Sequence, residues 1–147
     1  FHSRYNARSK EYRYHILNSQ LPSAIGRGYH WHIRKPLDVA RMDLAASHLH
    51  GSHDFKAFEG TGSPRSHTVR TVFRTELHPE DEGNLVFHIE ANGFLRFMVR
   101  NIVGTLVEVG LNRIGPEDVK NVLGSRDRGK AGPTAPPQGL FLVRVNY

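Results

Sequence analysis

One arginine lies in an otherwise largely apolar stretch of the sequence. Arg100 falls within residues 97–109, and a helix of this composition is expected to be buried. A guanidinium keeps its proton, so a buried arginine needs an anionic partner or several hydrogen-bond acceptors. Arg100 could therefore hold an acidic catalytic group or a phosphate. It could also reach the surface near the start of the helix, or pair with an internal carboxylate such as Asp54 or Glu108.

Two short groups of histidines could be taken for metal ligands. These groups are His30-x-His32 and His48-x-His50-x-x-His53. A zinc ion needs three or four ligands that converge at fixed distances. One group borders a tryptophan, and the other lies at the end of an expected helix, where the helix dipole favours a cationic histidine. We therefore interpret these histidines as surface and helix-capping residues and expect no metal site.

Motifs for nucleophilic catalysis or nucleotide binding are missing from the sequence. No serine lies in a nucleophile-elbow pattern, and neither a Walker loop nor a dinucleotide fingerprint occurs. The sequence has no cysteine, which excludes thiolate chemistry and disulfides within it. The loop at residues 60–65 could hold a phosphate, although its glycine and serine content is more typical of a flexible loop.

Basic residues offer a stronger indication of a binding function. They surround one expected strand, flank a second and precede a proline-rich segment: Arg4, Arg8, Lys10 and Arg13; Arg65, Arg70 and Arg74; Arg126, Arg128 and Lys130. Tyr5, Tyr12 and Tyr14 are interleaved with the first group. Basic side chains follow phosphates and aromatic rings stack on unpaired bases, so the pattern fits an RNA-binding surface. It fits a solvated sheet edge with core tyrosines equally well.

Length and charge set outer limits on the function. The chain has 147 residues, enough for one domain with its own core, which we expect to span residues 1–147. Its 20 lysines and arginines exceed its 14 acidic residues, and the net charge of +6 permits a polyanionic partner. The sequence begins without methionine and shows neither a secretory leader nor a membrane span. We therefore expect a piece of a longer cytoplasmic protein that has no membrane partner.

Hydrophobic periodicity predicts the elements that position these side chains. Alternating polar and apolar residues predict strands at residues 11–17, 69–76, 85–91 and 140–147. Helical spacing predicts a helix from an N-cap at Asp38 to a stop at Gly51, the buried helix at 97–109, and a short helix from Pro116. A hairpin turn is expected at residues 80–84.

This order of elements indicates the class of fold. It is the β-α-β-β-α-β order of a ferredoxin-like α+β fold, in which helices cover one face of an antiparallel sheet. The other face must then be covered or used for binding. We expect Tyr12 to lie on that open face and to offer a flat stacking surface with a phenol at its edge.

Short sequence blocks along the whole chain form a distinctive set. They are Phe1-His2-x-Arg4, Glu11-Tyr12-Arg13-Tyr14, His53-Asp54-Phe55-x-x-Phe58, Arg70-Thr71-Val72, Asn92-Gly93-Phe94-Leu95, Met98-Val99-Arg100-Asn101-Ile102-Val103-Gly104 and Ala131-Gly132-Pro133-Thr134-Ala135-Pro136-Pro137-x-Gly139-Leu140. In this order they resemble the C-terminal half of the TruA-type tRNA pseudouridine synthases. The last two blocks are the most specific. The resemblance implies one half of the pseudouridine synthase catalytic fold.

The resemblance implies an isomerase that converts uridine to pseudouridine in the anticodon stem-loop of tRNA, at conventional tRNA positions 38 to 40. Such enzymes break the glycosidic bond, turn the base and rejoin it through carbon without a metal or other cofactor, and we expect a homodimer. Their catalytic aspartate belongs to an Arg-Thr-Asp-x-Gly-Val-His motif in the N-terminal half. That motif is absent here, because Arg70-Thr71 is followed by Val72. We therefore expect this chain to need the N-terminal half as a partner and to be inactive alone.

The resemblance also implies roles for individual residues. Tyr12 matches the family's active-site tyrosine, which stacks on the uracil and is placed for proton transfer. Arg100 matches the arginine that pairs with the catalytic aspartate. Gly139 and Leu140 match the loop that closes over the base.

Three further residues are expected to bind the substrate RNA: Arg65, Arg70 and Asn92. The alternative to an enzyme fragment is a stand-alone RNA-binding module of ferredoxin-like fold without catalysis. The aromatic-rich motif of the RNA-recognition module is absent from the sequence, which counts against this alternative.

Overall fold

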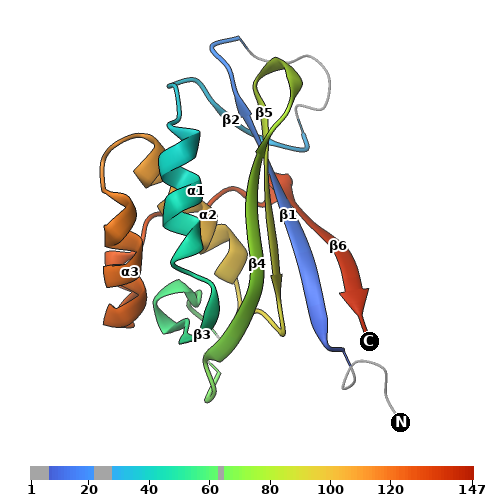
Figure 1. Cartoon of the computed structure of the whole chain (residues 1–147), viewed down its shortest axis with the longest axis vertical. Coiled ribbons are helices and arrows are strands. Elements are labelled where there is room, and N and C mark those ends of the chain that lie inside the picture. The colour runs from blue at the N-terminus through green and yellow to red at the C-terminus, as the bar shows by residue number, and fades with distance from the viewer. Residues whose placement is uncertain (1–6, 22–27, 63–64) are drawn as a thin grey trace.

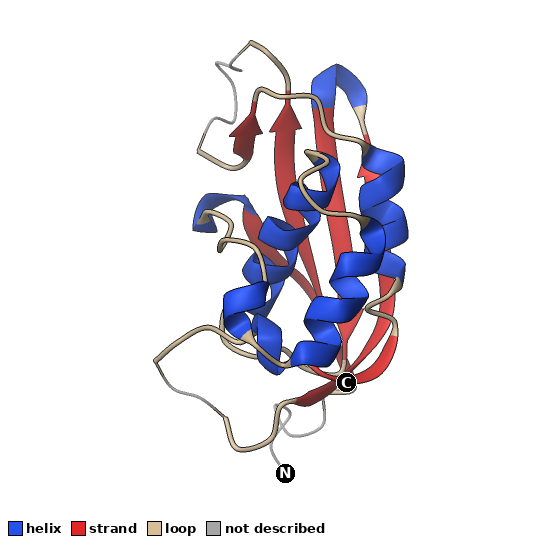
Figure 2. Ribbon diagram, turned by 90° about the vertical axis from the view of Figure 1, so that its left-hand side faces the viewer, coloured by secondary structure: helices blue, strands red, loops and turns tan. Residues whose placement is uncertain are grey.

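The computed structural model describes residues 7–21, 28–62 and 65–147. Its strands and α-helices are β1 (Ser9–Asn18), β2 (Trp31–Ile33), α1 (Val39–Ser47), β3 (Gly51–Asp54), β4 (Val69–Pro79), β5 (Asn84–Ala91), α2 (Met98–Gly110), α3 (Pro116–Ser125) and β6 (Leu140–Asn146). The strands form one six-stranded sheet, and the helices lie against one of its faces (Figures 1 and 2). The expected α+β class is confirmed. The sequence block at residues 1–4 and Tyr5 lie outside the described residues.

The sheet is built around β1 and β5. These two strands pair antiparallel, and β5 also pairs antiparallel with β4 across the expected hairpin turn. On the other edge of β1, β6 pairs antiparallel with residues Ser9–Tyr14 and the short β2 pairs parallel with Ile16–Asn18. The four long strands therefore follow the order β6-β1-β5-β4, and each neighbouring pair among them is antiparallel.

The sequence pattern predicts the long elements but neither β2 nor β3. These strands have three and four residues, too few to show the alternation that identifies a strand. Asp38 caps α1 as expected, since its Oδ1 accepts a hydrogen bond from the Arg41 N–H at 3.1 Å. The helix ends at Ser47, before the expected stop at Gly51. With a φ of +97°, Gly51 instead opens the edge strand β3.

Helix α2 lies in the core, as its composition predicts. All of its residues except Arg100 and Glu108 are buried. Burial of each aliphatic side chain contributes about 1.5–3 kcal/mol, so this helix is a main source of stability for the fold. The residue before it, Phe97, has a φ of +59°, which is unusual for a residue other than glycine. Within the described residues, no helix combines the length and apolarity needed to cross a membrane.

Tyr12 faces the helices, so the expectation that it lies on the open face of the sheet is wrong. Successive side chains of a strand alternate between faces, and Tyr12 shares its face with the core residues Tyr14 and Ile16. It also lies opposite Ile89 of β5, whose side chain is fully buried. Glu11 and Arg13 occupy the alternate positions of β1, so their side chains lie on the other face of the sheet.

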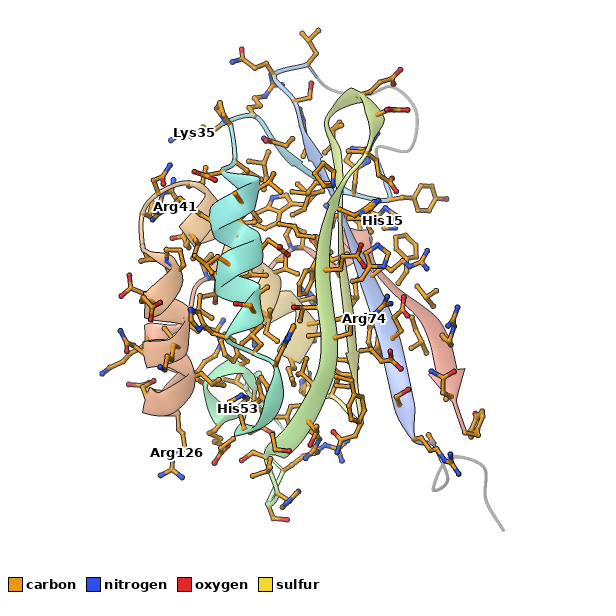
Figure 3. The ribbon with its side chains drawn as sticks, in the orientation of Figure 1. His15, Lys35, Arg41, His53, Arg74 and Arg126 are labelled. Atoms are coloured by element: carbon orange, nitrogen blue, oxygen red, sulfur yellow. The ribbon has the colours of Figure 1, made fainter. Side chains whose placement is uncertain are left out.

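The open face of the sheet carries charged side chains. Glu11 lies 3.0 Å from Arg74, 3.4 Å from Arg13 and 3.6 Å from His88. Burial raises the pKa of Glu11, but Arg74, Arg13 and His88 outweigh it, so the pKa is lowered from its ordinary value of 4.5. Figure 3 shows His15 and Arg74 on this side of the sheet, away from the helices.

Candidate active site

The loop at residues 131–139 lies directly on α2, and two glycines make this contact possible. A Cβ atom on Gly104 would lie 1.6 Å from the carbonyl oxygen of Pro133, so a larger residue would displace the loop. A Cβ atom on Gly132 would lie 2.9 Å from the carbonyl oxygen of Gly104. The two most specific sequence blocks, one on the helix and one in the loop, therefore form a single contact in space.

Buried polar side chains of α2 hold this loop in place. Asn101 Oδ1 accepts hydrogen bonds from the Thr134 hydroxyl at 2.6 Å and from Arg128 at 3.1 Å. Thr105 Oγ1 accepts one from the Gly132 N–H at 2.9 Å. Asn101 and Thr105 are buried, and leaving such a group unpaired costs about 1–3 kcal/mol. The network therefore fixes the loop against the helix.

Arg100 is a further connection between α2 and the loop. Its Nε–H donates to the Ala135 carbonyl at 2.7 Å, and the Ala135 N–H donates to the Arg100 carbonyl at 3.0 Å. The guanidinium carbon lies 4.8 Å from the centre of the Phe97 ring, within range of a cation–π contact. The two terminal nitrogens of Arg100 make no hydrogen bond within the described residues, which leaves them open to an anion.

Neither internal carboxylate considered from the sequence is the partner of Arg100. Asp54 accepts a hydrogen bond from Thr68, and Glu108 pairs with Arg113 at 2.9 Å. In the part of the chain that the structure describes, no carboxylate lies within 4.0 Å of the Arg100 guanidinium. This distance excludes an ion pair between Arg100 and either Asp54 or Glu108. Arg100 itself lies half-buried in the first turn of α2.

Tyr12 reaches the same region from the sheet. Its half-buried ring meets Phe94 edge-to-face, with the ring centres 5.0 Å apart and the planes at 88°. Phe94 belongs to the segment that leads into α2, three residues before Phe97. Tyr12 and Arg100 make no direct hydrogen bond in the described structure, but both border this segment.

Tyr14 is a site residue that the sequence pattern does not single out. Its hydroxyl donates to the Pro136 carbonyl, and its ring is fully buried. A Cβ atom on Gly139 would lie 2.8 Å from this ring, which explains the glycine in the loop. Burial raises the pKa of Tyr14 while Arg100 opposes the rise, so the hydroxyl stays protonated. The sequence places Tyr14 in the block Glu11-Tyr12-Arg13-Tyr14 and in phase with Tyr12, but gives it no role of its own.

Leu140 lies where the loop becomes β6. It is opposite Tyr14 in the β1–β6 pairing, so its side chain lies on the same face of the sheet as Tyr12 and Tyr14. It is partly buried and packs against the core. Gly139 and Leu140 thus lie at Tyr14, Arg100 is bonded to Ala135 of the same loop, and Tyr12 lies on the same face of β1 as Tyr14. We call the five residues Tyr12, Tyr14, Arg100, Gly139 and Leu140 the candidate active site.

Arg65, Arg70 and Asn92 form a second group, at one end of the β4–β5 pair. Asn92 Oδ1 accepts a hydrogen bond from the Thr71 N–H at 2.8 Å, so its amide joins the strands. Arg70 donates to two backbone carbonyls at 3.0 and 2.8 Å. Burial lowers the pKa of Arg70, and the positive charge of Arg65 lowers it further. Two neighbouring cations suit a phosphate, but none of the three residues bonds to Tyr12 or Arg100 in the described structure.

The histidines make separate hydrogen bonds. His48 caps the C-terminus of α1, as expected, and His50 Nε2 lies 2.6 Å from the Thr75 hydroxyl. His53 Nε2 lies 2.7 Å from the His50 carbonyl. No three histidine or acidic side chains of the described residues group in a way that could hold a metal ion.

The candidate active site can bind an anion and a planar ring. Arg100 offers a guanidinium fork, which matches the two oxygens of a carboxylate. Phe97 beside it is 40% exposed as a residue, and Tyr12 adds a phenol to the same border.

Comparison with known proteins matches the chain to one family. A family model for tRNA pseudouridine synthase matches residues 45–147. Over 147 residues the chain is 49% identical to tRNA pseudouridine synthase A of Thermoanaerobacter sp. (strain X514), 48% to that of Moorella thermoacetica and 40% to that of Orientia tsutsugamushi. Each match covers all of this chain. It covers 60% of the Thermoanaerobacter protein, 59% of the Moorella protein and 52% of the Orientia protein. The chain thus spans 60% or less of these relatives and matches their C-terminal part.

Proposed function

This chain belongs to the TruA-type tRNA pseudouridine synthase family, and on that premise we propose that it is the C-terminal part of an isomerase acting on tRNA. The proposed substrates are uridines of the anticodon stem-loop at positions 38 to 40. The N1–C1′ bond breaks, the base turns, and a C5–C1′ bond forms. The proton on C5 leaves and N1 gains one, so the reaction is a redox-neutral isomerisation.

The observation that carries this proposal is the arrangement of Arg100. Its Nε is bonded to Ala135, while its terminal nitrogens have no carboxylate partner among the described residues. We assign them to an aspartate on the part of the protein that precedes this chain. A nearby guanidinium lowers the pKa of a carboxyl group and keeps it ionised. Two parallel hydrogen bonds also fix the direction of the carboxylate, so that it can act on the nucleotide.

The other residues of the candidate active site would handle the base. We assign Tyr12 to stacking on the uracil, with its phenol available for proton transfer, because Phe94 holds its ring edge-to-face. Leu140 and the Gly139 backbone would cover the base from the loop. Arg65, Arg70 and Asn92 would contact the RNA outside the reacting nucleotide, which their separate position at the end of β4 and β5 supports.

The proposal extends to fold and assembly. The antiparallel order β6-β1-β5-β4 supports a ferredoxin-like arrangement, with β2 and β3 as additions at its edges. The N-terminal half of the same protein is the proposed partner that supplies the aspartate. A cytoplasmic homodimer remains a prediction from the family resemblance, and light scattering on the complete protein tests its mass.

The proposed function is tested with the complete protein and an unmodified tRNA transcript. Carbodiimide labelling followed by primer extension locates each pseudouridine. We expect conversion at positions 38 to 40 and at no other uridine. Conversion elsewhere would contradict the anticodon assignment. RNA binding without any conversion would favour the stand-alone binding module.

A further inference from the structure

Arg126 lies where three hollows of the surface meet. The hollows measure about 400, 320 and 400 Å³, and Arg126 lines part of each. Figure 3 shows Arg126 at the end of α3, pointing away from the body of the protein. Its side chain is 66% exposed, and its Nη1 lies 3.5 Å from Asp54 Oδ2. The three hollows therefore form one surface with an exposed guanidinium at its centre.

The carboxylates of this surface hold the local backbone. The Glu59 side chain is 2% exposed and accepts hydrogen bonds from Lys56 Nζ at 2.8 Å and from the Arg65 N–H at 2.9 Å. Asp54 accepts from the Thr68 hydroxyl at 2.7 Å and from the Lys56 N–H at 3.1 Å. Both acids keep their negative charge, and each faces one cation: Lys56 lies 2.8 Å from Glu59, and Arg126 lies 3.5 Å from Asp54.

Basic side chains remain to face the hollows. Lys120 lines the hollow between α3 and β3, and Arg65 lines the hollow beside it. In the described structure neither side chain lies within 4.0 Å of a carboxylate oxygen. Because Lys56 and Arg126 already match the charges of Glu59 and Asp54, Lys120 and Arg65 leave this surface with a net positive charge.

The same surface continues to the candidate active site. A Cβ atom on Gly60, which lines the middle hollow, would lie 2.5 Å from the Phe97 ring. A Cβ atom on Gly62 would lie 3.6 Å from the guanidinium carbon of Arg96. Arg96 and Arg100 both lie over the Phe97 ring, at 4.7 and 4.8 Å from its centre. The hollows therefore begin beside the arginine assigned to the catalytic aspartate.

We propose that Arg96, Arg65, Arg126 and Lys120, which we call the basic track, bind the phosphate backbone of the tRNA strand that flanks the target uridine. This proposal rests on the proposed function, which makes tRNA the substrate. Guanidinium groups bind phosphate oxygens through two parallel donors, and each neutralised phosphate releases counterions. A nucleotide held beside Arg100 would direct the phosphates of its neighbours along the track.

The test is equilibrium binding of tRNA to the complete protein at a series of salt concentrations, followed by fluorescence anisotropy. Arg126→Gln removes one charge from the track, and adding Lys120→Gln removes a second. Arg113→Gln is the matched control, because Arg113 is 53% exposed, has one carboxylate partner at 2.9 Å, and follows the opposite end of α2. Arg126→Lys keeps the charge.

The expected result is a change in salt dependence. The slope of log K against log salt should fall in magnitude by about 1 in Arg126→Gln and about 2 in the double variant. Arg113→Gln and Arg126→Lys should keep the wild-type slope. An unchanged slope in the double variant, or an equal drop in Arg113→Gln, would overturn the basic track. So would a loss in Arg126→Gln that Arg126→Lys shares, because the effect would then not be electrostatic.

These outcomes are separate from those of the proposed function. If the wild-type protein converts uridine but the Arg126 and Lys120 variants keep its slope of log K against log salt, the basic track alone is overturned. A wild-type protein that converts no uridine overturns the proposed function, whatever its salt dependence.

Discussion

Arg100 and Ala135 are joined by two hydrogen bonds of opposite direction. The side chain of Arg100 donates to the Ala135 carbonyl at 2.7 Å, and the Ala135 N–H donates to the Arg100 carbonyl at 3.0 Å. The first bond orients the guanidinium, and the second fixes the position of the 131–139 loop along the axis of α2. The position of Arg100 therefore depends on the same loop that leads to Leu140.

Gly104→Ala should disrupt this arrangement. Its methyl group would meet the Pro133 carbonyl, which lies 1.6 Å from the ideal Cβ position, so the loop must move. We expect a loss of about 1–3 kcal/mol in the free energy of unfolding, measured by urea titration. The control is Gly124→Ala in α3, where no atom lies within 4 Å of the new methyl group. It should be neutral or stabilise the protein by up to about 1 kcal/mol, and an equal loss in both variants would refute the loop contact.

Arg100→Lys should abolish most activity of the complete protein while the fold persists. An ammonium cannot present two parallel donors to a carboxylate, so we expect a drop of about 100-fold or more in single-turnover rate. Arg113→Lys, at a residue paired with Glu108 far from the site, should keep the wild-type rate. If the Arg100→Lys protein turns over normally, a simple positive charge is sufficient and the paired geometry is unnecessary.

Tyr12 should contribute its ring to the fold and its hydroxyl to the reaction. Tyr12→Phe keeps the edge-to-face contact with Phe94, so Tm should stay the same while kcat falls. Tyr12→Leu also loses the aromatic contact, which is worth about 0.5–1.5 kcal/mol, so Tm should fall as well. Thermal melts and steady-state kinetics separate the two effects. A full kcat in Tyr12→Phe would remove the phenol from the mechanism.

The stability of the protein at acidic pH should depend on the charged cluster around Glu11 on the open face of the sheet. The folded-state pKa of Glu11 is lowered, by cations that outweigh its burial. A lowered pKa contributes stability that is complete above the unfolded value and is lost as the pH falls through the folded value. Stability should therefore decrease as the pH drops below about 4.5, the ordinary value for this group.

Glu11→Gln tests this pH dependence. The variant should be less stable than the wild type at neutral pH and should show a smaller further loss on acidification, measured by urea unfolding at each pH. Asp43→Asn is the control, because Asp43 is exposed and makes no hydrogen bond or ion pair within the described residues. A Glu11→Gln protein with the acid sensitivity of the wild type would show that other carboxylates dominate.

The long elements could be predicted because each has a local cause. Asp38 caps α1 by itself, and the apolar run of α2 indicates burial wherever the helix lies. The strands β2 and β3 could not be predicted, because each is only three or four residues long. Each is held by hydrogen bonds to a strand distant in sequence, β2 to β1 and β3 to β4.

The site could be predicted only in part, because its contacts are tertiary. Alternation along β1 groups Tyr12 with Tyr14, but only the pairing with Ile89 shows which face the helices cover. The sequence places Gly104 in a helix, whereas the carbonyl that requires a glycine there comes from Pro133. That Arg100 pairs with a carboxylate stays a prediction from the family resemblance, and its bond to Ala135 carries no sequence signal.

The most direct test of the account is complementation between two separately produced pieces. One is this 147-residue chain, and the other is the preceding part of the complete protein, which is proposed to carry the catalytic aspartate. Release of tritium from C5-labelled uridine in a tRNA transcript measures turnover. We expect no turnover by either piece alone and measurable turnover by the mixture, which is lost again when the chain carries Arg100→Lys. Turnover by the 147-residue chain alone would contradict it, because the acid that acts on the nucleotide would then lie within this chain.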